Sequence, residues 1–93
     1  MSDTPAFIEP FELDDLTREL YAALRMIAHR ERLRANRPQT MVTTALINES
    51  YVRLRQSKGW ISREHFLASA ATAMRHALID NARARLSLKR GAG

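Results

Sequence analysis

Residues 62–90 of this 93-residue chain read SREHFLASAATAMRHALIDNARARLSLKR, and this stretch decides the fold. Its apolar and small residues recur every three or four positions, which places them on one face of a helix. Ser62 can accept a hydrogen bond from the free amides of the first turn, so the helix is expected to begin at Ser62 or Arg63. The residues of this face, which need partner helices, are Phe66, Ala70, Met74, Ala77, Leu78, Asn81 and Ala82.

Two helices are expected upstream to cover that face. The first should run from about Asp14 to Ala35, because its leucines and one isoleucine form a helical stripe and the Arg37-Pro38 pair stops it. The second, residues 43–56 (TTALINESYVRLRQ), is expected to be capped by Thr43 or Thr44. The sequence therefore predicts an all-α fold: a compact three-helix bundle, or four helices if a short N-terminal turn is counted.

Composition indicates one small globular domain. The chain has 45% hydrophobic and 27% charged residues, no cysteine, and no apolar run long enough to cross a membrane. Its first residues lack the basic and apolar pattern of a secretory signal, so we expect a cytoplasmic protein without a membrane partner. We divide it into a flexible tail (residues 1–12), a helical domain (13–90) and a C-terminal end (91–93).

Charge is divided unevenly along the chain. Residues 1–24 carry six acids against one arginine, a net −5, while the other residues carry 14 basic groups against four acids, a net +10. A basic back half suggests a polyanion site, although a solvated helical surface explains many such charge runs equally well.

Catalytic or metal chemistry finds no support in the sequence. There is no glycine-rich phosphate loop and no cysteine nucleophile. His65 and His76 are 11 residues apart on one helix, roughly 16 Å, so they cannot share an ion, and His29 is isolated among arginines. We expect no enzyme activity, no cofactor and no metal site.

The order and spacing of several motifs resemble region 2 of the extracytoplasmic-function (ECF) sigma factors. The resemblance is strong from residue 44 to 91 and extends weakly back to Leu20. In that family the helices read T-A-L-x-x-E-x-Y-x-R-L, W-x-x-x-x-H-F and A-M-R-x-x-L-x-D-x-A-R-x-R. The matching residues here are Thr44, Ala45, Leu46, Glu49, Tyr51, Arg53, Leu54, Trp60, His65, Phe66, Ala73, Met74, Arg75, Leu78, Asp80, Ala82, Arg83 and Arg85.

The resemblance implies two binding surfaces. The helix of residues 43–56 would dock on the clamp helices of the largest RNA polymerase subunit, through Asn48, Glu49 and Arg53. The link 56–63 and the long helix would hold the non-template strand of the promoter minus-ten element. An opened strand needs cations for its phosphates and a surface for an extruded base. The candidate DNA-binding residues are Lys58, Trp60, Arg63, Arg75, Arg83 and Arg85. On general grounds, however, a tryptophan at the position of Trp60 more often plugs the end of a helical core.

Two departures from the family pattern stand out. Such factors normally continue through a linker into a second helical domain, whereas this sequence ends at Gly93. Many members also carry acids ahead of the polymerase-binding helix, where this chain has residues 40–44, TMVTT. Phosphorylation of Thr40, Thr43 or Thr44 would restore negative charge there, although these threonines can equally be simple caps. A kinase and an anti-sigma regulator are therefore candidate partners.

Two other function classes remain open from the residues alone. A small helical protein-interaction module would keep its binding after loss of Arg83 and Arg85. A stand-alone regulator that binds duplex DNA would place the long helix in a major groove and prefer double-stranded to single-stranded DNA.

Overall fold

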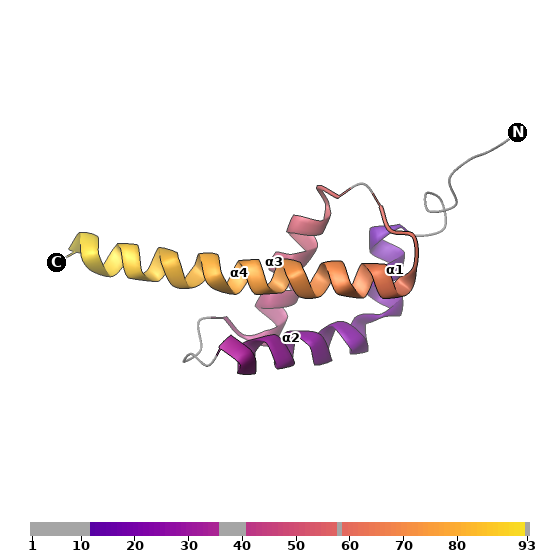
Figure 1. Cartoon of the computed structure of the whole chain (residues 1–93), viewed down its shortest axis with the longest axis horizontal. Helices are drawn as coiled ribbons and strands as arrows, with labels where there is room; N and C mark the ends of the chain where they lie inside the picture. The colour runs from indigo at the N-terminus through magenta and orange to yellow at the C-terminus, as the bar shows by residue number, and fades with distance from the viewer. Residues whose placement is uncertain (1–11, 36–40, 58, 93) are drawn as a thin grey trace, which may run out of the picture.

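The computed structural model describes residues 12–35, 41–57 and 59–92, with side chains described as far as residue 88. Within these residues the chain forms four α-helices and no strand: α1 (Leu13–Glu19), α2 (Tyr21–Ala35), α3 (Thr43–Leu54) and α4 (Arg63–Ala92). The all-α prediction is confirmed. Figure 1 shows α4 along the longest axis, with α2 running beside it and α3 crossing behind it, and both shorter helices pack against α4.

The first predicted helix is in fact two helices. The chain bends at Leu20, which has φ −106° and ψ 21°, so α1 and α2 replace the single helix expected from Asp14 to Ala35. Neither glycine nor proline marks the bend. The amide of Leu20 still donates to Leu16 O, and that of Leu24 to Leu20 O, at 2.8 and 2.9 Å. The bend lets both Leu16 and Leu24 be buried, each only 2% exposed.

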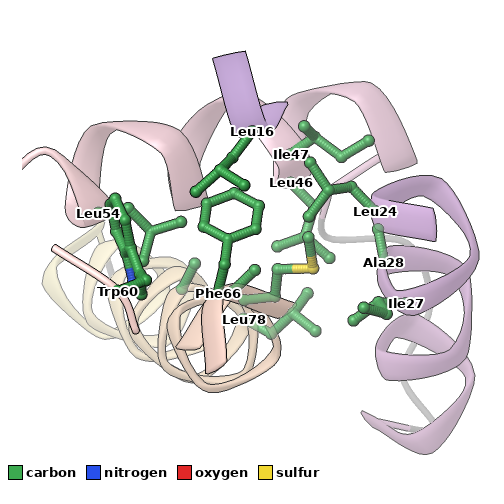
Figure 2. Packing of buried hydrophobic residues seen from close by; sticks show 13 residues of the cluster. Leu16, Leu24, Ile27, Ala28, Leu46, Ile47, Leu54, Trp60, Phe66 and Leu78 are labelled. Atoms are coloured by element: carbon green, nitrogen blue, oxygen red, sulfur yellow. The ribbon is translucent and has the colours of Figure 1, made fainter. Parts of the chain in front are cut away.

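The core forms where the predicted stripes meet. Phe66, Ala70 and Met74 of α4 have no exposed surface, and Phe66 lies among side chains from the other three helices and the α3–α4 link (Figure 2). The fully buried face of α4 ends near Leu78, since Asn81 and Ala82 are only partly buried. The complete buried apolar set is Leu16, Leu24, Ile27, Ala28, Leu46, Ile47, Leu54, Trp60, Phe66, Ala70, Met74, Ala77 and Leu78.

The two predicted helix caps differ in outcome. Ser62 caps α4 as expected: its Oγ accepts a 3.0 Å hydrogen bond from the amide of His65. The predicted threonine cap of α3 is wrong, because Val42 occupies the N-cap position and no side chain caps the helix. Thr43 is the first helical residue instead, and its Oγ1 accepts a 3.1 Å hydrogen bond from Arg32 Nη1.

The second half of α4 extends beyond the other helices (Figure 1). Residues 83–88 are exposed, including Leu86 at 53% and Leu88 at 74%. The helix ends at Ala92, two residues beyond the predicted end at Arg90. The expected tail lies outside the described residues except for Glu12.

Candidate nucleic-acid interface

The link between α3 and α4, of which the structure describes residues 55–57 and 59–62, joins the end of α3 to the start of α4, and we call it the corner. α3 ends in tight turns, with the amides of Gln56 and Ser57 donating to Arg53 O and Leu54 O at 3.2 and 2.9 Å. Gly59 then adopts φ 121°, a conformation that other residues avoid, so the sequence requires glycine here. The amide of Ile61 donates to His65 Nδ1 at 3.0 Å, which ties the corner to the first turn of α4.

Trp60 lies inside this corner and not on its surface. Its side chain is only 4% exposed, and its ring meets the ring of Phe66 edge to face, with centroids 5.2 Å apart and planes at 89°. Figure 2 shows it at the end of the cluster, beside Leu54. The expectation of Trp60 as a surface on which a base stacks is therefore corrected: in this structure Trp60 closes the end of the core. Lys58, the other candidate in the link, lies outside the described residues.

A groove does separate the corner from α4, and we call it the corner groove. It has a volume of about 480 Å³ and lies between the end of α3, the corner and the middle of α4. Six of its eight lining residues have polar side chains, which offer hydrogen-bond donors and acceptors. The lining residues are Arg53, Leu54, Gln56, Ser57, Ser69, Thr72, Ala73 and His76.

Sequence reasoning missed most of these polar residues. Ser69, Thr72 and His76 follow one another at intervals of three and four, so they share one face of α4. From the sequence alone this face has no assigned role. The signal was present in the spacing, but only the fold brings it opposite Gln56 and Ser57.

The candidate arginines of α4 do not form one stripe. Arg83 and Arg85 are both exposed but are two residues apart, roughly 200° around a helix of 3.6 residues per turn. Arg75 reaches toward α2, where its Nε and Nη2 donate to the two carboxylate oxygens of Glu31 at 3.2 and 3.1 Å. The structure therefore does not bring the candidate arginines together on one face of α4, and their contact with DNA stays a prediction.

Arg63, the remaining candidate, is held by α1. Its guanidinium donates two hydrogen bonds to the Glu19 carboxylate. This pairing lowers the pKa of Glu19 and raises the pKa of Arg63. A second contact docks α1 on α3, since the Tyr51 hydroxyl donates to Asp14 and its pKa is raised by that bond. The acidic first helix thus neutralises one of the basic groups near the corner.

The candidate polymerase-binding residues occupy the outer side of α3. Asn48 is exposed, while Arg53 bridges two carboxylates, Glu49 at 3.3 Å and Asp80 of α4 at 3.1 Å. Glu49 and Arg53 are therefore brought together, and Asn48 lies roughly 100° around the helix from Glu49. At the start of α3, Thr44 is exposed and Thr43 is partly buried, whereas Thr40 lies outside the described residues.

In the part of the chain that the structure describes, no group of three histidine, cysteine or acidic side chains is arranged to hold a metal ion. None of the described helices has an apolar stretch long enough to cross a bilayer.

Comparison with known proteins gives one match. A family model described as "ECF sigma factor" matches residues 10–93. No curated protein and no solved structure matches the chain. The matched range includes the corner, the corner groove and all four helices.

Proposed function

Because the chain belongs to the ECF sigma factor family, we propose that it serves as region 2 of such a factor in transcription initiation. In this role α3 holds the RNA polymerase core, and the corner and α4 hold the non-template strand of the promoter minus-ten element. The corner groove is the observation that carries the DNA half of the proposal. It is a hollow lined by several polar side chains beside the link that, by the family resemblance, would receive an extruded base.

The DNA contacts are divided between the groove and the exposed cations. Gln56, Ser57 and His76 offer hydrogen bonds to a base edge, while Trp60 supports the corner from inside. Arg83 and Arg85 serve the phosphates, since neither forms an ion pair with any described residue. Lys58, in the sequence between α3 and α4, is a further candidate for a phosphate contact. Arg63 and Arg75 reach DNA only by leaving Glu19 and Glu31.

Fluorescence anisotropy with a single-stranded minus-ten oligonucleotide tests the DNA half. The parent chain is titrated against this oligonucleotide and a scrambled one at two salt concentrations, with and without core polymerase, which is the control for weak binding by the chain alone. We expect tighter binding of the minus-ten strand. We also expect Arg83→Ala to reduce the slope of log affinity against log salt by about 0.7, the value for one single-strand phosphate contact.

Matched variants separate the groove from the general charge. Gln56→Ala and His76→Ala should each weaken minus-ten binding about tenfold, the cost of a lost base contact. His29→Ala is the control, because His29 is exposed on α2 and does not line the corner groove. Equal binding of the minus-ten and scrambled strands in the presence of polymerase would refute the proposal.

The polymerase half concerns the exposed side of α3. Asn48→Ala and Glu49→Ala should reduce capture of core polymerase, and Arg53→Ala should do so while also releasing Asp80. Arg30→Ala on α2 is the control, because it removes an exposed cation away from α3. Full capture by all three α3 variants would contradict this half and leave the DNA half standing.

Phosphorylation at the start of α3 completes the proposal. The first turn of α3 contains no acid, so a phosphate there would meet an uncompensated helix N-terminus. Thr44 is exposed and accessible to a kinase, whereas Thr43 already hydrogen-bonds Arg32, and Thr40 precedes the helix. Polymerase capture is measured with Thr43→Glu and Thr44→Glu. We expect a gain over the parent chain, larger for Thr44→Glu, and no gain in either would remove the idea.

A further inference from the structure

A second hollow lies between the end of α2 and the second half of α4, and we call it the basic groove. Its volume is about 720 Å³, within the range of sites that hold a small ligand or a peptide face. No described residue lines both this groove and the corner groove. The promoter proposal uses Arg83, and Arg75 only if it leaves Glu31, so the aliphatic lining and the other arginines of the basic groove have no role in it.

Three exposed aliphatic side chains line the basic groove, and we call them its floor. Leu33 of α2 is 67% exposed, and Ile79 and Leu86 of α4 are 45% and 53% exposed. Ile79 and Leu86 are two helical turns apart on the same side of α4, so they form a short apolar track facing Leu33. Clustered exposed aliphatic side chains of this kind mark binding surfaces for proteins.

The rim of the basic groove is positively charged. Four arginines line it, and Glu31 is the one acid among its described lining residues, which gives a net +3 with His29 neutral. That acid is also occupied: its carboxylate is 4% exposed, accepts two hydrogen bonds from Arg75, and lies 3.8 Å from Arg34. The rim therefore favours a ligand that brings negative charge.

The floor and rim together select among three kinds of occupant. A second copy of this chain would bring one net-positive groove against another, which opposes association. Nucleic acid would meet the arginines, but the described lining offers a base only the imidazole of His29 and no tryptophan, tyrosine or phenylalanine on which to stack. An amphipathic helix with an apolar stripe between acidic flanks satisfies both features.

We propose that the basic groove is a docking site for an acidic amphipathic helix of a partner protein. The partner's apolar stripe packs on Leu33, Ile79 and Leu86, and its acidic flanks pair with the arginines of the rim. The site shares Arg83 with the proposed promoter surface, but its aliphatic contacts belong to neither the promoter nor the polymerase surface, so it would remain even if those proposals failed.

A designed peptide probes this site directly. The probe is a labelled helical peptide of roughly 18 residues, about 27 Å long, with leucines on one stripe and glutamates beside it; a scrambled peptide of equal composition is the reference. Leu33→Glu and Leu86→Glu should each weaken its binding at least tenfold, as loss of a central apolar contact does. Leu88→Glu is the matched control, because Leu88 is a 74% exposed leucine on the same helix that does not line the groove. Its effect should stay below about twofold.

A charge pair of variants tests the rim. Arg34→Glu should weaken the peptide at least about tenfold, because a repelling charge replaces an attracting one. Arg30→Glu changes an exposed arginine of α2 outside the groove, so it should weaken peptide binding by about threefold or less, through general charge alone. Circular dichroism and Trp60 emission, which report the fold, should be unchanged in every variant.

Several outcomes would overturn the inference. One is equal binding of the designed and scrambled peptides, and another is an equal loss in Leu88→Glu. Displacement of the peptide by an oligonucleotide, with oligonucleotide binding lost in Leu33→Glu and Leu86→Glu, would make the groove a nucleic-acid surface. A dimer seen in sedimentation and abolished by Leu86→Glu would assign it to a second copy.

Discussion

Trp60 shows how one side chain serves a site without touching its ligand. It is buried against Phe66 beneath the corner, so replacement by alanine removes a large part of the core's end. We expect Trp60→Ala to lower the free energy of unfolding by about 3–5 kcal/mol, measured by urea titration followed by circular dichroism. Trp60→Phe keeps an aromatic ring there, so it should retain the fold and bind the minus-ten oligonucleotide within about twofold of the parent. A stable Trp60→Phe protein that no longer binds DNA would mean that the indole itself contacts the strand.

The sequence placed several residues correctly. The burial of Phe66, Met74 and Leu24 followed from helical spacing, and the Ser62 cap followed from its place before the apolar run. Spacing along one helix could not reveal that Glu31 would be buried under Arg75, 44 residues away. Arg75 was therefore interpreted as free for DNA. Pairing between helices depends on the crossing of α2 and α4, which the sequence does not state.

The Glu19–Arg63 pair makes a prediction about pH. Arg63 lowers the folded-state pKa of Glu19 from its ordinary 4.5, so the pair stabilises the fold fully above pH 4.5 and this contribution is lost as the pH falls through the lowered pKa. A carbon-13 NMR titration of the Glu19 carboxyl should give a midpoint below 4.5. Arg63→Gln should move that midpoint back up. Arg18→Gln is the control, because Arg18 pairs with Asp15 on the same helix. An unchanged midpoint in Arg63→Gln would show that the pair does not persist in solution.

At the scale of elements, the corner depends on Gly59. Its φ of 121° is a region that residues with a Cβ occupy only at a cost. Gly59→Ala should therefore lower the free energy of unfolding by about 1–3 kcal/mol in urea titration. The same variant should weaken oligonucleotide binding more than its stability loss explains, because the corner groove changes shape. Ser57→Ala, an exposed change in the same link, should change the free energy of unfolding by no more than about 0.5 kcal/mol. A neutral Gly59→Ala would mean that the link adopts another path.

The number of helices illustrates what periodicity leaves open. The leucine stripe of residues 13–27 fits one continuous helix as well as two, since Leu16 and Leu24 keep helical spacing across the bend. The bend at Leu20 carries no glycine or proline, so no local residue announces it. It arises from packing, because α1 contacts α2 and α3 and is held by bonds to Tyr51 and Arg63.

At the scale of the whole molecule, the support of α4 changes along its length. Its first half packs against α2 and α3, whereas residues 83–88 are exposed. Amide hydrogen exchange should therefore be at least about tenfold faster for residues 83–88 than for 66–78, measured by NMR on the free chain. Addition of a ligand that covers the second half of α4 should slow the amide exchange of residues 83–88. Equal protection of both halves in the free chain would indicate that something already covers the end of α4.

The uninterrupted length of α4 fixes the distance between its two ends. Thirty residues at a rise of about 1.5 Å measure roughly 45 Å, the axial length of about 13 base pairs at 3.4 Å each. A ligand bound near Ser62 is therefore held at a fixed distance and a fixed rotation angle from a ligand bound at the C-terminal end of α4. One alanine inserted near the middle would advance the tip by about 1.5 Å and rotate it by about 100°, so the spacing between two ligands is encoded in residue count.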